Sequence, residues 1–131
     1  MTDDLPTAGE ILAAHERIEE EYDLKYKGVM KAAPKLKLRR EVIEPAGEYD
    51  DPYHRAAVLL WKIPSVHVFE DANKRTAWTV TSAYLRRKGI DPPAVDDRTE
   101  RIVRRLGLFS IEEIATWLET GEIDEDRLPE H

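Results

Sequence analysis

The chain has 131 residues, which fits one compact domain with its own hydrophobic core, and we expect no second domain. It contains no cysteine, which excludes a disulfide framework and thiolate metal sites and makes the reducing cytoplasm the expected location. The formal net charge of −7 argues against general attraction to nucleic acid. No apolar run approaches the roughly 20 residues that cross a bilayer, and the N-terminus is acidic where a signal peptide is basic, so we expect no membrane association.

Residues 10–22 carry the first helical pattern. Apolar or semi-apolar side chains recur there at the spacing of one helix face, at Ile11, His15, Ile18 and Tyr22. Thr7 is a suitable N-cap, and Glu10, three residues later, would complete a capping box. We therefore predict a helix in which His15 packs rather than catalyses.

Residues 22–52 have no clean period. Glycine and proline interrupt the segment at Gly28, Pro34, Pro45, Gly47 and Pro52, so we expect mostly loop, with a short helix near Met30. From Leu24 to Arg40 seven residues are basic and none is acidic: Lys25, Lys27, Lys31, Lys35, Lys37, Arg39 and Arg40. This segment is either a solvated charged surface or a docking surface for an acidic partner or a nucleic-acid-associated target.

Four more helices follow. We predict them over residues 53–63, ended by Pro64; over 73–88, closed by Gly89; from Asp97; and from Ser110 with Glu113 as its capping partner. Residues 73–88 are apolar around much of the circumference, which is typical of a central helix. The predicted fold is all-α, a compact bundle of about six helices around a central helix. It forms a single domain over residues 1–121, followed by a loose acidic tail over residues 122–131.

The residues with the richest chemistry run from His67 to Arg75. His67 is the candidate general base, because imidazole titrates near neutrality. Asp71 is both a candidate N-cap of the following helix and a candidate carboxylate ligand of Mg²⁺. Asn73, Lys74 and Arg75, together with the amides of the first turn, favour a bound phosphate.

The same stretch resembles the Fic/Doc signature, and specifically the death-on-curing (Doc) branch. Of the Fic pattern H-P-F-x-x-G-N-G-R-x-x-R the chain keeps His67, Phe69, Asn73 and Arg75; it departs at Val68, Ala72, Lys74 and Trp78. The resemblance implies a Fic-like fold and a loop that Phe69 anchors. The A-N-K-R form implies a toxin of a type II toxin–antitoxin system, a kinase that transfers a phosphoryl group from ATP with Mg²⁺ to a threonine of translation elongation factor Tu. It thereby arrests translation.

Two further features follow from that resemblance. Fic proteins place a substrate-docking flap about where residues 42–50 lie, so we expect a short β flap that pairs its main chain with the target. We find no self-inhibitory [S/T]-x-x-x-E-[G/N] motif in the sequence, so a separately encoded antitoxin is expected to bind in trans.

Three alternatives stay open from the sequence. The same loop could transfer AMP instead of phosphate, although the arginine that grips the nucleotide phosphates in nucleotidyl-transferring members is replaced by Trp78. The chain could be a catalytically inactive protein-binding module. It could also be a nucleic-acid-binding protein with Asn73-Lys74-Arg75 opening a recognition helix, which Ala77, Trp78 and Val80 argue against because they look buried.

Overall fold

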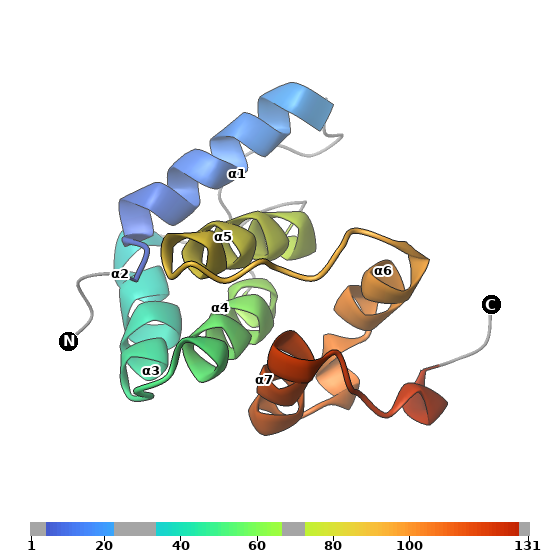
Figure 1. The fold of residues 1–131 in the computed structure, drawn as a ribbon. Coiled ribbons are helices and arrows are strands. Elements are labelled where there is room, and N and C mark those ends of the chain that lie inside the picture. The colour runs from blue at the N-terminus through green and yellow to red at the C-terminus, as the bar shows by residue number, and fades with distance from the viewer. Residues whose placement is uncertain (1–4, 23–33, 67–72, 129–131) are drawn as a thin grey trace.

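The computed structural model describes residues 5–22, 34–66 and 73–128. In those ranges every regular element is helical, with no strand, which confirms the predicted all-α bundle (Figure 1). The longer helices are α1 (Ala8–Tyr22), α4 (Pro52–Ser65), α5 (Asn73–Arg87), α6 (Asp97–Arg104) and α7 (Ile111–Thr120). The shorter elements are α2 (Pro34–Leu38), the π-helix η1 (Arg39–Ile43), α3 (Glu44–Gly47), and the 3₁₀ turns η2 (Leu106–Leu108) and η3 (Glu125–Arg127). None of the described helices is long and apolar enough to span a membrane.

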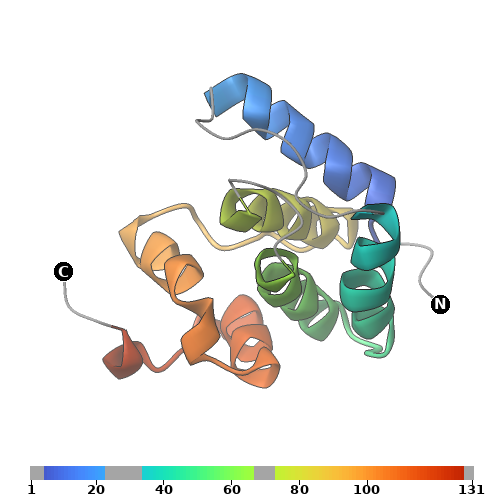
Figure 2. The same ribbon diagram turned by 180° about the vertical axis from the view of Figure 1, so that it is seen from behind.

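The helix at the centre of the bundle is α4. Residues 56–60, five in succession, are all buried, and α4 packs against α5 on one side and α7 on another, with η1 and α3 alongside (Figures 1 and 2). Helix α5, which the sequence suggested for the central place, lies between α1 and α4 and keeps one exposed side. The bundle prediction therefore holds, with the central helix one element earlier in the chain.

Helix ends follow the predicted capping chemistry. At the start of α1 the Glu10 amide donates to Thr7 Oγ1 at 3.1 Å and the Thr7 amide donates to Glu10 Oε1 at 3.3 Å, which confirms the capping box. The same reciprocal bonds join Ser110 and Glu113 at the start of α7. Helix α6 begins at Asp97, as predicted, and Asp96 caps it by accepting a hydrogen bond from the Thr99 amide at 2.8 Å. His15 is 1% exposed and packs in the core, as predicted.

Residues 34–47 correct the sequence analysis, because they are helical where we expected loop and a β flap over residues 42–50. Leu38, Val42 and Ala46, four residues apart, are all fully buried, so this segment turns one helical face to the core. Burying a valine stabilises by about 1.5–3 kcal/mol, whereas its helix propensity costs less than about 0.7 kcal/mol. Packing therefore outweighs the β preference of Val42 and Ile43. The described part of residues 22–52 begins at Pro34, so the helix near Met30 lies outside it.

Two smaller expectations also change. Helix α4 continues through Pro64 to Ser65, because a proline in the last turn removes only one amide and the Val66 amide still donates to the Lys62 carbonyl at 3.1 Å.

The segment after Gly121 is not loose as far as residue 128. Leu128 is 6% exposed and joins the core, and Arg127 pairs with Glu113 at 2.7 Å. The division into a catalytic domain and a tail stays a prediction.

Candidate active site

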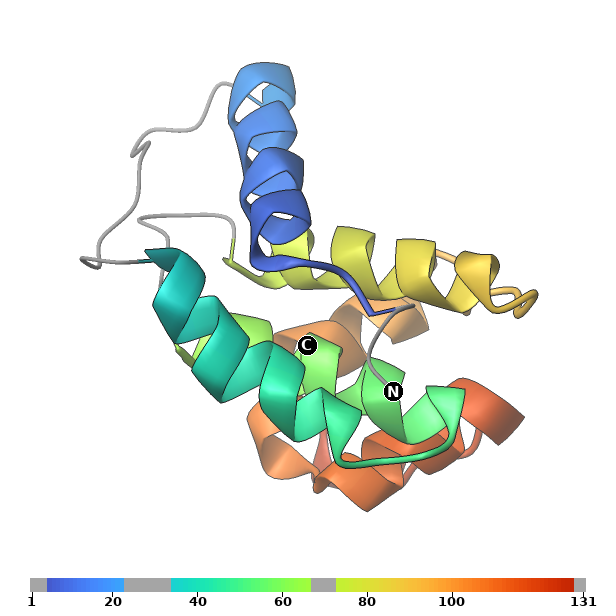
Figure 3. The ribbon, with the colours of Figure 1, turned by 90° about the vertical axis from the view of Figure 1, so that its left-hand side faces the viewer.

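The candidate site lies at one end of the bundle, where α4 ends and α5 begins. Figure 3 shows the end of α4, the start of α5 and the start of α2 on the same side of the molecule. His67, Phe69 and Asp71, the predicted base, loop anchor and metal ligand, follow α4 and precede α5 in the sequence and lie outside the described residues. Their roles stay predictions.

Asn73, Lys74 and Arg75 open α5 as the structure describes it. Asn73 is half-buried, whereas Lys74 and Arg75 are exposed. Asn73 and Arg75 both make interactions of their own. Successive helical residues point about 100° apart, so these side chains can surround a ligand at the end of the helix but cannot all project in one direction.

Lys74 connects the candidate site to helix α6. Its ammonium Nζ donates to the main-chain carbonyl of Arg104 at 2.6 Å. Arg104 is the last residue of α6, where unpaired carbonyls carry partial negative charge that favours a cation. An ammonium has three donors, so this contact leaves others available for a ligand. The sequence offered no signal for it, because the acceptor is a backbone atom 30 residues away.

The residues just inside α5 are packed against the bundle. Thr76 and Ala77 are fully buried and Val80 is 6% exposed, so packing against the core holds the first turn of α5 in place. Trp78 is partly buried, and its ring lies 6.4 Å from that of Trp117 in α7. Packing of this kind fixes the axis of α5, and with it the direction in which the helix start points. It also agrees with the argument against a recognition helix.

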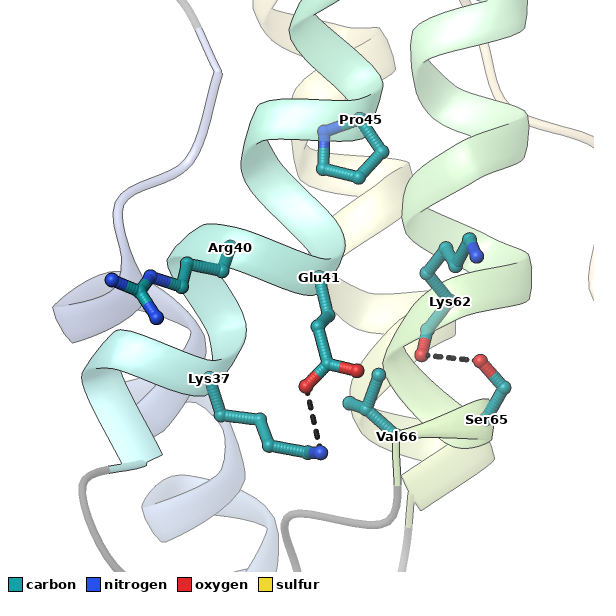
Figure 4. A pocket seen from close by; sticks show the side chains of 7 residues that line it. All are labelled: Lys37, Arg40, Glu41, Pro45, Lys62, Ser65 and Val66. Atoms are coloured by element: carbon teal, nitrogen blue, oxygen red, sulfur yellow. Dashed lines mark hydrogen bonds and ion pairs between the residues drawn. The ribbon is translucent and has the colours of Figure 1, made fainter.

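A groove opens beside the end of α4. It has a volume of about 530 Å³ and is lined by residues from α2, η1, α3 and α4: Lys37, Arg40, Glu41, Pro45, Lys62, Ser65 and Val66 (Figure 4). Val66 is the residue before His67, so the groove adjoins the candidate site. The sequence marks Lys37 and Arg40 as part of the basic segment, and no pattern in it marks the α4 residues of the groove.

The residue types at the start of α5 fit a phosphate group. A 15-residue helix starts there with an amide, an ammonium and a guanidinium, all of which bind phosphate oxygens. Within the described ranges no group of three or more His, Cys, Asp or Glu side chains is placed to hold a metal ion. Asp71 lies outside those ranges, so the magnesium site stays a prediction.

Comparison with known proteins adds one match. The family model of the Fic/DOC family matches residues 5–85, which include α1 to α4, the whole stretch His67–Arg75 and nearly all of α5. Helices α6 and α7 lie beyond the match. No curated protein matches the chain.

Proposed function

This chain belongs to the Fic/DOC family of transferases, and from that premise we propose that it transfers a phosphoryl group from ATP to a hydroxyl of a protein. The observation that carries the proposal is the sequence Ala72-Asn73-Lys74-Arg75. It has the form of Doc toxins, where the broad Fic pattern has G-N-G-R. A lysine in place of the second glycine adds a cation at the start of α5.

In the proposed reaction His67 takes the proton of the acceptor hydroxyl as the new phosphate ester bond forms and the bond to the leaving nucleoside diphosphate breaks. Asn73, Lys74, Arg75 and the first amides of α5 stabilise the negative charge on the transferring group. Asp71 would hold Mg²⁺, which neutralises phosphate charge when bound. Phe69 anchors the loop that carries these groups.

The surroundings of Trp78 favour phosphoryl transfer over AMP transfer. In nucleotidyl-transferring members this position is an arginine that grips the nucleotide phosphates. Here an indole occupies it, partly buried and in contact with the Trp117 ring. The side chain supplies no cation, and its packing directs it toward α7. AMP transfer is therefore the second candidate.

The resemblance to Doc toxins extends the proposal to a biological setting. We place the chain in a type II toxin–antitoxin system, in the cytoplasm, with a threonine of translation elongation factor Tu as the acceptor and translation arrest as the outcome. An antitoxin encoded separately would cover the site in trans, which agrees with a sequence in which we find no self-inhibitory motif.

The test uses purified elongation factor Tu with ATP labelled at either the α or the γ phosphorus. We expect label to enter the factor from γ-labelled ATP alone, and His67→Ala to abolish it while the circular dichroism spectrum stays helical. His54→Ala is the matched control, because His54 lies in the first turn of α4, at the far end of that helix from Val66. Label from α-labelled ATP would replace the kinase with AMP transfer. No label from either would support an inactive binding module.

A further inference from the structure

We propose that the outer face of α2 and η1 docks an acidic segment of the protein that this chain modifies. The face consists of Lys35, Leu36, Arg39 and Arg40, and we call these residues the basic face. The inference rests on the proposed function, because it supplies a means of substrate recognition for that same site.

The basic face is exposed, and no described residue of the chain neutralises its charge. All four residues are exposed, and Leu36, which is 42% exposed, places an apolar side chain among the three cations. In the described part of the chain no carboxylate pairs with Lys35, Arg39 or Arg40, whereas the neighbouring Lys37 pairs with Glu41 at 2.7 Å. Among the described residues, therefore, the three cations of this face have no partner, in a protein whose net charge is −7. An acidic segment supplies the missing counter-charge, and an apolar residue within it can cover Leu36.

The spacing of these residues sets the face apart from the core. Positions 35, 36, 39 and 40 share one exposed arc of the helix surface, and the adjoining arc carries Leu38 and Val42, which are buried in the core. Arg39 and Arg40 belong to the π-helix, in which the Glu44 amide donates to the Arg39 carbonyl. Wide turns of this kind are rare and occur frequently at functional sites. The π-helix at the centre of the basic face is therefore consistent with a functional role for this surface.

The adjoining groove connects the basic face to the candidate active site. Figure 4 shows Arg40 projecting from η1 away from α4, while Lys37 and Glu41 point toward each other beside Val66. One peptide bond joins Val66 to His67. An extended segment advances about 3.3 Å per residue, so a segment a few residues long can lead from the basic face along the groove to Val66, the last described residue before His67. The groove therefore favours the substrate protein as the occupant, because the acceptor hydroxyl of that protein must reach the candidate active site.

The test measures binding and transfer separately. The first probe is a fluorescein-labelled peptide with one threonine among glutamates and leucines, and the second has lysine at every glutamate. Fluorescence anisotropy should show that the wild-type chain binds the glutamate peptide and not the lysine peptide, more weakly as salt rises. Arg40→Glu should weaken binding by about fivefold or more, since it replaces an attraction with a repulsion. Arg86→Glu, the same change at an exposed arginine near the end of α5, should leave binding unchanged.

Other results would overturn the docking proposal or assign the basic face to a different partner. Equal binding of the two peptides, or equal loss in both variants, would overturn the docking proposal. Tighter binding of a single-stranded oligonucleotide that depends on Arg40 would assign the face to nucleic acid instead, and a dimer in sedimentation that Arg40→Glu dissociates would assign it to a second copy. Transfer from γ-labelled ATP to the glutamate peptide, unchanged in Arg40→Glu, would overturn docking and leave the kinase intact. Binding that depends on Arg40, without transfer to the peptide, would support docking, and the assay with elongation factor Tu would decide the kinase separately.

Discussion

Lys74, in the first turn of α5, donates a hydrogen bond of 2.6 Å to the main-chain carbonyl of Arg104, at the end of α6. The contact joins the candidate active site to a helix outside the part of the chain that the family model matches. The partial negative charge at the end of α6 attracts the ammonium, which stays close to the start of α5. Helix α6 thus positions the Lys74 ammonium at the candidate active site, in addition to contributing to the core.

The first prediction concerns Lys74→Met, which keeps the length of the side chain and removes its charge. Phosphoryl transfer should fall at least about tenfold, because a charge-assisted hydrogen bond to phosphate contributes about 1.5–3 kcal/mol. The free energy of unfolding should fall by only about 0.5–1.5 kcal/mol, the contribution of one hydrogen bond. Transfer from γ-labelled ATP and urea unfolding measure the two effects.

Lys74→Arg is the matched control, because it keeps both the charge and several donors. It should retain most of the stability and part of the activity. If Lys74→Met lost stability but transferred at the wild-type rate, the lysine would serve only to hold α6, and its proposed role at the phosphate would be wrong.

The second prediction concerns the contact between Trp78 and Trp117. Trp78→Arg restores the residue of the broad Fic pattern but replaces a ring that packs against a fully buried one. We expect a loss of about 1–3 kcal/mol in the free energy of unfolding, the range for disrupted packing and partly buried charge. We also expect no gain of label from α-labelled ATP. Thr79→Arg, at the next and exposed position, should change stability by no more than about 0.5 kcal/mol.

The third prediction concerns pH and the cap of α4. Asp51 accepts hydrogen bonds from the amides of Tyr53 and His54, at 3.1 and 3.0 Å, and from the His54 ring. Partial burial acts to raise the pKa of the Asp51 carboxyl, but the hydrogen bonds and charge of His54 outweigh it and leave the pKa below its usual value. Asp51 therefore stabilises the fold above the ordinary aspartate pKa of about 4, and this stability is lost as pH falls through the lowered pKa.

Asp51→Ala should lower the free energy of unfolding by about 1 kcal/mol at neutral pH, the usual cost of removing an N-cap. The difference between variant and wild type should shrink as the pH is lowered below about 4. Asp51→Asn, which keeps the cap without the charge, should recover most of the neutral-pH loss. Urea unfolding over a pH series checks this, and a difference that persisted unchanged at low pH would contradict it.

Sequence patterns predicted the fold wherever local chemistry and helix periodicity agreed. Thr7 with Glu10 and Ser110 with Glu113 mark helix starts that the structure has, because a capping box is a local interaction. Residues 34–47 were missed because β-branched and proline residues mask a face whose buried positions recur every four residues. That four-residue spacing was the signal that identifies this helix.

Less of the candidate site than of the fold could be predicted from sequence patterns. The sequence identified Asn73, Lys74 and Arg75 as a group, and they do open α5. The hydrogen bond from Lys74 to α6 and the groove beside Val66 both depend on how distant segments pack, and no local pattern encodes either of them. The positions of His67, Phe69 and Asp71 stay predictions, since these residues lie outside the described ranges.

The last prediction concerns the segment after Gly121, which its acidic composition led us to expect to be loose. Leu128 is only 6% exposed, whereas Leu108 is 45% exposed, so the two leucines form a matched pair. Leu128→Ala should cost about 2–3 kcal/mol in the free energy of unfolding, and Leu108→Ala less than about 1 kcal/mol, because only the first change empties a buried volume. Urea unfolding of both variants measures the difference. Equal and small losses would show that the buried position of Leu128 contributes little to the stability of the fold.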